Sequence, residues 1–277
     1  MARPRSPVRT RPALALIALL LAGSAPPLLA QEAGKDPVPP GEGMIEQPCP
    51  AQTGLWFGHP YVRANDWAWL CRFREDNAKI APEAAPQAVF IGDSITEGWG
   101  RADPAFFDAT HANRGISGQT TPQMLLRFMQ DVVALHPQVV HIMAGTNDVA
   151  GNTGPNRPED FRNTIRAMTT LAKANGIAVV IASIPPADHF GWNPRLTPAP
   201  RIAELNAWLR DFARTNGLVY ADYYGALADA GGGLPASFSK DGVHPEAAGY
   251  AVMRAIAERA IAEALSQTGR TTTVRRH

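Results

Sequence analysis

Short apolar runs alternate along this chain with longer segments of helical period. The runs occupy residues 88–91, 139–143, 177–184 and 218–221, with a weaker one at 111–114. Between them, segments 121–135, 158–175, 200–216 and 245–265 are helix-like. This alternation predicts an α/β fold in which a central parallel sheet of about five strands is covered by helices on both faces.

Polar motifs stand where the predicted strands end. "GDSIT" follows the first run, "GISGQTT" the second and "AGTNDVA" the third, while "KDGVHPEAAGY" leads into the last helix. Ligands of parallel sheets bind beyond the carboxyl ends of the strands. We therefore expect these four motifs to converge on one side of the sheet.

Ser94 lies at the first of these strand-to-helix turns. A serine at such a turn presents its oxygen and the surrounding backbone N–H groups to a ligand above the sheet, as a nucleophile must. Gly-Asp-Ser is also ordinary turn chemistry, in which Asp and Ser cap the following helix. Ser94 is a candidate nucleophile and not only a helix cap if the chain also supplies a base, an orienting acid and an oxyanion hole.

The "DGVHP" stretch supplies a base and an acid together. His244 would accept the proton of a serine, and Asp241, three residues earlier, would hold the other ring nitrogen. Pro245 suits the first turn of the closing helix. The alternative is a plain Asp-Gly turn followed by a solvated histidine.

Two further motifs offer hydrogen-bond donors for an oxyanion. The side-chain amide of Asn147 follows the third strand, and the backbone N–H of Gly118 permits close approach. The N–H of Ser94 would be a third donor. Taken singly, Asn147 is a good turn residue, and Gly118 would serve only to allow a positive φ.

"GDSIT", "NRGISGQTT", "GTND" and "DGVHP" resemble, in this order, the four conserved blocks of the SGNH, or GDSL-type, esterase and lipase superfamily. The resemblance implies a flavodoxin-like three-layer α/β/α sandwich. Position by position, it implies Ser94 as nucleophile, His244 as base, Asp241 as its partner, and Gly118 and Asn147 as oxyanion donors. It implies no metal and no cofactor. The G-x-S-x-G elbow of the α/β-hydrolases does not occur in the chain, which argues against that fold.

These residues predict an exported serine esterase that hydrolyses short-chain acyl esters, above all acetyl esters, of carbohydrates or small alcohols. The loop "PPADHFGWNPRLTPAP" at 185–200 would wall the site. Trp56, Trp67, Trp69 and Trp99 are candidates to stack on sugar rings, with core packing as the alternative. The competing functions are a lipase or lysophospholipase, an acyltransferase acting on cell-envelope substrates, and an inactive binding module.

The first 30 residues predict a secretory signal peptide. Four arginines precede an apolar run at 13–22, and small residues lead to a cleavage site near Ala30. An uncleaved anchor is the alternative, and no later segment has the roughly 20 apolar residues that a membrane span needs. We expect a flexible linker at 31–46, one hydrolase domain at 47–266, and a disordered basic tail at 267–277. The mature protein would be periplasmic or secreted.

The net charge limits the classes of molecule that the chain can bind, and the cysteines predict a covalent cross-link. Removing the four arginines of residues 1–30, which contain no acid, takes the formal net charge from +1 to −3. Without a dense basic stripe, this argues against nucleic acid as a partner. Cys49 and Cys71 are the only cysteines, and an even pair in an exported chain predicts a disulfide. Two free buried thiols are the alternative.

Overall fold

The central sheet has five parallel strands in the computed structural model, which describes residues 49–56 and 58–274. The strands are β1 (Ala88–Gly92), β2 (His111–Gly115), β3 (Val139–Met143), β4 (Ala178–Ala182) and β5 (Val219–Ala221). Their order across the sheet is β2-β1-β3-β4-β5. This is the strand order of flavodoxin-like folds, and it confirms the predicted α/β/α architecture.

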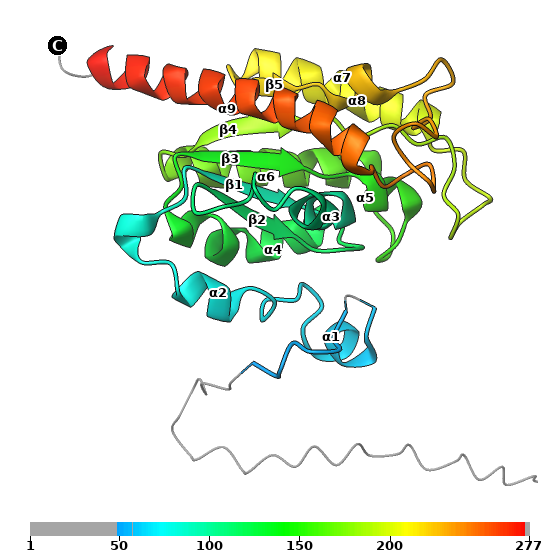
Figure 1. Cartoon of the computed structure of the whole chain (residues 1–277), viewed down its shortest axis with the longest axis horizontal. Coiled ribbons are helices and arrows are strands. Elements are labelled where there is room, and N and C mark those ends of the chain that lie inside the picture. The colour runs from blue at the N-terminus through cyan, green and yellow to red at the C-terminus, as the bar shows by residue number, and fades with distance from the viewer. Residues whose placement is uncertain (1–48, 57, 275–277) are drawn as a thin grey trace, which may run out of the picture. The chain divides into compact units, whose positions relative to one another are not determined.

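Helices cover both faces of the sheet because successive strand residues point to opposite sides. Val89 and Ile91 of β1 pack into a cluster with apolar residues of α4 (Thr121–Asp131), α6 (Pro158–Ala174) and α7 (Ala199–Thr215). Phe90, between them, packs with α3 (Ser94–Ala102), α8 (Tyr223–Leu227) and α9 (Ala247–Val274). Figure 1 shows α9 crossing one face while α4 and α6 lie on the other. The strands are therefore buried on both sides.

The strand order creates the point where a ligand can bind. From β1 the chain reaches the edge strand β2 through α3, and from β3 it proceeds the other way, through α5 (Thr146–Ala150) and α6, to β4. A crevice forms beyond the carboxyl ends of β1 and β3, where these connections diverge. Ser94 opens α3 and Asn147 lies in α5, so both face this crevice from adjacent strands.

Proline and capping residues set where the long helices begin. Pro122, Pro158 and Pro200 occupy the first turns of α4, α6 and α7, where a missing N–H breaks no helical bond. α9 begins at Ala247, two residues after Pro245, and is helical as far as Val274. No proline follows Leu265 to stop it, so the helix continues into the segment that we expected to be a disordered tail. Residues 275–277 lie outside the described ranges.

The spacing of Trp67, Leu70, Cys71 and Phe73 would place these side chains on one face of a helix, but the structure is not helical at residues 67–73. Before β1, the described residues form α1 (Pro60–Asn65), α2 (Arg74–Ala78) and the 3₁₀ turn η1 (Pro82–Ala84). A second 3₁₀ turn, η2 (Val133–Leu135), follows α4. The Asp66 carboxylate accepts hydrogen bonds from the N–H groups of Leu70 and Cys71, and Trp69 has a φ of +52°. A continuous helix over 67–73 is therefore wrong.

Cys49 and Cys71 form the predicted disulfide, with their Cα atoms 5.5 Å apart. The bond closes a loop with a sequence separation of 22, which stabilises a fold by about 3 kcal/mol in the chain-entropy model. The predicted signal peptide and linker fall outside the described residues. Among the helices that the structure describes, none is both long and apolar enough to cross a membrane.

Candidate active site

Ser94, His244 and Asp241 form one chain of hydrogen bonds. The Ser94 hydroxyl lies 2.8 Å from Nε2 of His244, across 150 positions of sequence. Nδ1 of the same ring lies 2.7 Å from Oδ2 of Asp241. The structure thus brings together the three residues that we singled out in two distant motifs.

Asp241 is held in its ionised form. Its second oxygen, Oδ1, accepts hydrogen bonds from the N–H groups of Val243 and His244, at 2.9 and 2.8 Å, and from the Ser239 hydroxyl at 3.0 Å. Burial alone would raise the pKa of Asp241, but these backbone bonds and the ring and charge of His244 outweigh it and hold the pKa well below its usual range. Because a carboxylate only accepts, the ring proton lies on Nδ1, and Nε2 is left to accept from Ser94.

The turn that carries Ser94 is as tight as its sequence suggests. Asp93 caps α3, and its Oδ1 accepts a hydrogen bond from the N–H of Ile95 at 2.9 Å. At Gly92, a Cβ atom would lie 2.0 Å from Oγ1 of Thr96 and 2.8 Å from the carbonyl oxygen of Met143. Only glycine fits there, so the helix that begins at Ser94 can start directly at the end of β1.

Asn147 joins the turn of Ser94 to the loop of Gly118. Its side-chain NH₂ donates to the carbonyl oxygen of Gln119 at 3.1 Å and to Oδ2 of Asp93 at 3.3 Å. Gly118, directly before Gln119, has a φ of +77°, which a residue with a Cβ rarely adopts. The three positions expected to supply oxyanion donors therefore belong to segments in direct contact.

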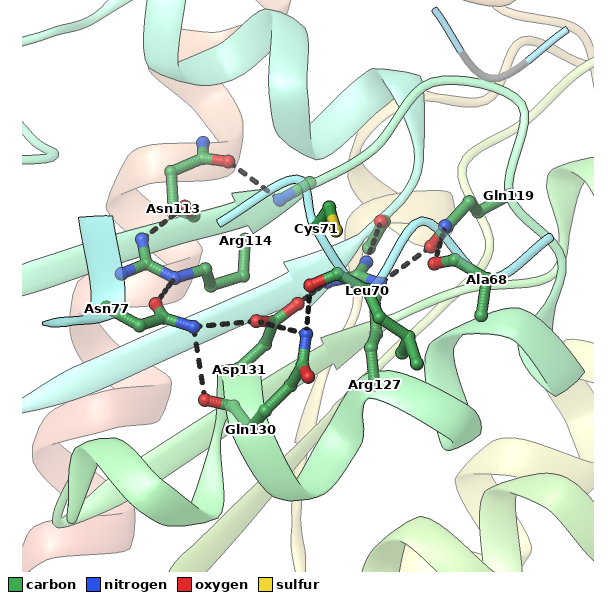
Figure 2. A network of polar contacts seen from close by, with 12 residues as sticks. Ala68, Leu70, Cys71, Asn77, Asn113, Arg114, Gln119, Arg127, Gln130 and Asp131 are labelled. Carbon is green, nitrogen blue, oxygen red and sulfur yellow. Dashed lines mark hydrogen bonds and ion pairs between the residues drawn. The ribbon is translucent and has the colours of Figure 1, made fainter. Parts of the chain in front are cut away.

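A second hydrogen-bonded cluster supports this region from inside the fold. Arg127, fully buried, donates to Oε1 of Gln119 at 2.6 Å, to Asp131 at 3.1 Å and to the carbonyl oxygen of Gly92 at 3.1 Å. Figure 2 shows Arg127 between Gln119 and Asp131, with Gln119 also reaching Ala68 of the disulfide-closed segment. One guanidinium group thus connects the end of β1 to the loop that follows Gly118.

Two buried aspartates lie beside the site. Burial raises the pKa of Asp93 to about 6, although the hydrogen bond from the N–H of Ile95 lowers it. Burial also raises the pKa of Asp148 to about 6, and the charge of Asp93 raises it further by a smaller amount. Hydrogen bonds from the N–H and hydroxyl groups of Thr121 lower it. Both carboxyl groups therefore resist ionisation in the folded protein.

We expect these aspartates to make the folded state less stable as the pH rises. Between pH 4 and 6 the unfolded chain releases the proton of Asp148 while the folded protein retains it, so ionisation favours unfolding. In Asp148→Asn this position cannot titrate. When the pH is raised from 4 to 7, the free energy of unfolding of the variant should rise relative to wild type by up to about 3 kcal/mol.

Urea denaturation at both pH values measures this difference, and any constant cost of the substitution cancels between them. Asp211→Asn, on the exposed side of α7, is the control and should follow wild type at both pH values. The same pH dependence in Asp148→Asn and wild type would contradict the prediction.

Ser94 opens onto a cleft of about 510 Å³. Small and polar residues predominate in its lining, which is formed by Ser94, Gly98, Arg101, Ala102, Ser117, His244, Pro245 and Tyr250. Arg101 lies 3.5 Å from Glu97, whose carboxylate also accepts a hydrogen bond from the N–H of Ser117. The cleft therefore joins the turn of Ser94 to the loop before Gly118.

Trp192 and Asn152 lie at the site but were not singled out from the sequence. Trp192 is 48% exposed, and the centroid of its ring is 6.4 Å from that of the His244 ring. Its indole N–H donates to Oδ1 of Asn152 at 3.0 Å, and the NH₂ of Asn152 donates to Oδ1 of Asn147 at 2.5 Å. The only signal for Trp192 in the sequence was its place in the loop at 185–200, after the fourth strand.

The four tryptophans proposed as sugar platforms divide into two classes. Trp69 and Trp99 are buried, so both are core residues. Trp56 and Trp67 are 55% and 41% exposed. Trp67 lines a separate cavity of about 350 Å³ that also touches Asn152.

A second histidine–aspartate pair lies on the loop at 185–200. Nδ1 of His189 is 2.6 Å from Oδ1 of Asp188, and both side chains are more than half exposed. A Cβ atom at Gly242 would lie 2.5 Å from the His189 ring, so this ring packs against the turn that carries His244. His189 has an acidic partner but is not the histidine that contacts Ser94.

The sequence also matches a known protein family. The profile of the GDSL-like Lipase/Acylhydrolase family matches residues 90–252, a range that includes Ser94, Asn147, Asp241 and His244. This chain belongs to the GDSL-like lipase/acylhydrolase family. The sequence resemblance to GDSL-type enzymes is thereby confirmed.

Two solved structures, of an acylhydrolase and of a GDSL-like lipase, are similar over most of the chain. A proposed acylhydrolase from Bacteroides fragilis is 42% identical, covers 72% of this chain and 99% of its own, and has a TM-score of 0.69. A GDSL-like lipase from Bacteroides thetaiotaomicron is 40% identical, covers 71% and 98%, and has a TM-score of 0.68. Together with the family match, they identify the GDSL-like chain as a serine ester hydrolase.

A more distant structure shares the fold. The acetylxylan esterase Axe2 from Geobacillus stearothermophilus is 20% identical, covers 63% of this chain and 93% of its own, and has a TM-score of 0.52. Among curated proteins, none matches this chain.

Proposed function

We propose that Ser94, His244 and Asp241 form the catalytic triad of an esterase that removes short acyl groups, above all acetyl, from carbohydrates. The observation that carries the proposal is the chain of hydrogen bonds from Ser94 through His244 to Asp241, at 2.8 and 2.7 Å. In this geometry Nε2 of His244 accepts the hydroxyl proton as Oγ of Ser94 attacks the acyl carbon. Asp241 stabilises the imidazolium that forms.

The tetrahedral oxyanion would be bound by the N–H groups of Ser94 and Gly118 and by the side-chain NH₂ of Asn147. One amide hydrogen of Asn147 is held by the carbonyl oxygen of Gln119. The other makes only a long contact, 3.3 Å, with Asp93, and this is the hydrogen that we assign to the oxyanion. His244 then protonates the leaving alcohol, and a water molecule activated by the same ring hydrolyses the acyl-enzyme.

Two observations support a small acyl group on a sugar. Half of the residues that line the cleft at Ser94 have short side chains, namely Ser94, Gly98, Ala102 and Ser117, and this supports an acetyl group over a long alkyl chain. Beside His244, the exposed ring of Trp192 offers an aromatic face on which the apolar face of a sugar can stack. The acetylxylan esterase of similar fold acts on substrates of this class.

Export is a further part of this proposal. The predicted signal peptide at 1–30 would direct the chain to the periplasm or outside the cell. The Cys49–Cys71 disulfide supports this location, because disulfides persist mainly in oxidising compartments.

A substrate panel tests the proposed specificity. p-Nitrophenyl acetate, butyrate and octanoate, acetylated xylo-oligosaccharides and a lysophospholipid would be compared by kcat/KM, with released acid and transferred acyl group measured separately. We expect acetyl esters to be preferred over octanoyl esters by at least about tenfold, with acid as the main product. A preference for octanoyl ester or lysophospholipid would favour a lipase, and acyl transfer to added sugar would favour an acyltransferase.

A further inference from the structure

We propose that Trp192 and Asn152 are positioning residues that set the orientation of the Asn147 amide, so that its NH₂ and not its oxygen faces the oxyanion. The inference rests on the proposed function, because it requires Asn147 to be an oxyanion donor. Packing alone cannot set the orientation of an asparagine amide. The oxygen and the NH₂ of an asparagine have nearly the same size, so only their hydrogen-bond partners decide which way the group points.

The first step is the indole of Trp192, which can donate a hydrogen bond but cannot accept one. Its Nε1 lies 3.0 Å from the side chain of Asn152, so the atom of Asn152 that faces it must be the acceptor, Oδ1. The ring is held in place by stacking on buried Phe190, with centroids 4.9 Å apart and planes 24° apart. The indole therefore determines the orientation of the Asn152 amide.

The second step passes this orientation to Asn147. With Oδ1 of Asn152 turned to the indole, its NH₂ points to Asn147 and donates to Oδ1 of that residue at 2.5 Å. The backbone holds the two residues in register, because the N–H of Asn152 donates to the carbonyl oxygen of Asn147 at 3.1 Å. The Asn147 oxygen is thus bound by Asn152, and the NH₂ of Asn147 is left for other acceptors.

The third step follows at the site itself. The NH₂ of Asn147 is directed to Gln119 and Asp93, the two acceptors described above. If the Asn147 amide were flipped, its oxygen would face the carbonyl oxygen of Gln119. Its NH₂ would then face the NH₂ of Asn152. Two repulsive contacts would replace two hydrogen bonds, and the oxyanion would meet an acceptor instead of a donor. The chain of hydrogen bonds from Trp192 through Asn152 to Asn147, which we call the relay, thus excludes the inactive orientation of the Asn147 amide.

The relay begins where substrate would lie. Trp192 is about half exposed and close to His244, whereas Asn147 is buried. One face of its ring stacks on Phe190 and its N–H edge is committed to Asn152, so the opposite face is the one that we assign to a sugar. These two contributions can be separated, because stacking contributes to substrate binding and the N–H contributes to orientation of the oxyanion donor.

Substitutions at the two positions test the inference. Trp192→Phe keeps an aromatic ring and removes the N–H. Asn152→Leu keeps the size and removes both polar atoms, and Asn152→Asp keeps the acceptor for Trp192 but loses the donor to Asn147. With p-nitrophenyl acetate, each should lower kcat by about 10- to 100-fold, a part of the loss expected when an oxyanion donor is removed, with KM within about twofold. Asn175→Asp, at the exposed end of α6, is the matched control and should keep the wild-type kcat.

The Asn147→Ala background separates failure of this inference from failure of the proposed function. There, Trp192→Phe and Asn152→Leu should lower kcat no further, because the amide that they orient is gone. If Asn147→Ala itself retains the wild-type kcat, the oxyanion assignment is wrong. If Asn147→Ala loses activity while Trp192→Phe and Asn152→Leu retain the wild-type kcat, the relay is wrong.

A split between kcat and KM distinguishes positioning from other roles. A raised KM with unchanged kcat in Trp192→Phe would make Trp192 a substrate platform only and would overturn the relay. A fall in melting temperature with unchanged kcat would make these contacts merely structural, with the same consequence. Because Trp192 is exposed, Trp192→Phe should remain folded, and circular dichroism at the assay temperature checks this.

Discussion

Ser94→Ala and His244→Ala should each lower kcat by about 10⁴- to 10⁶-fold, and the double variant should lose little more. The reason is the 2.8 Å hydrogen bond between Oγ of Ser94 and Nε2 of His244, which makes each residue depend on the other. Without the ring, the hydroxyl has no base to accept its proton. Without the hydroxyl, the ring has no proton to accept. Initial rates with p-nitrophenyl acetate measure kcat for the three variants.

His189→Ala is the matched control for the loss of a histidine. Its ring has an aspartate partner at 2.6 Å, as that of His244 does, and it packs against the same turn at Gly242. We expect His189→Ala to retain kcat within a few-fold of wild type. A serine-directed organophosphonate should label the peptide containing Ser94 in wild type and in His189→Ala, and far more slowly in His244→Ala. Additive losses in the double variant, or labelling at another serine, would contradict the triad.

Asn147→Ala should lower kcat by about 10²- to 10³-fold and leave KM nearly unchanged. The amide would contribute its full hydrogen bond only when negative charge develops on the acyl oxygen, so its loss should raise the barrier without weakening substrate binding. Steady-state kinetics with p-nitrophenyl acetate provide both constants.

Asn147 also makes structural hydrogen bonds, so its variant needs a control for stability. Asn206 is similarly buried, and its amide bonds the N–H and the carbonyl oxygen of Ile184 at 2.8 and 2.9 Å. Asn206→Ala should lower the melting temperature and retain most of kcat. If Asn147→Ala changes only KM, Asn147 binds substrate, and if it changes only the melting temperature, Asn147 is a turn residue.

The sheet and the motifs at its strand ends could be predicted from local sequence. A strand of a parallel sheet is buried on both faces, so β1 appears in the sequence as an apolar run and β3 as one interrupted only by the buried His141. Polar residues that follow such runs must lie at one edge of the sheet. For this reason the residues of the site could be named before their distances were known.

The segment at 67–73 shows where local pattern misleads. Its apolar spacing fits a helix, but the carboxylate of Asp66 binds the N–H groups of Leu70 and Cys71, and the disulfide ties Cys71 to Cys49. Gln119, Gln123 and Gln130 then donate to the carbonyl oxygens of Ala68, Trp67 and Leu70. These partners are distant in sequence. They stabilise turns at residues 67–73 instead of the helix that the apolar periodicity favours.

By itself, the sequence determined the α/β architecture, the Cys49–Cys71 pairing and the identity of Ser94, Asn147, Asp241 and His244 as site candidates, because apolar period, cysteine number and motif order are all properties of the linear chain. The tertiary structure alone decided how these groups are oriented and ionised. Trp192 and Asn152 are 40 positions apart and meet only when the loop after β4 folds over α5. The raised pKa values of Asp93 and Asp148 arise from burial, and a carboxyl group is buried only by the elements that pack around it.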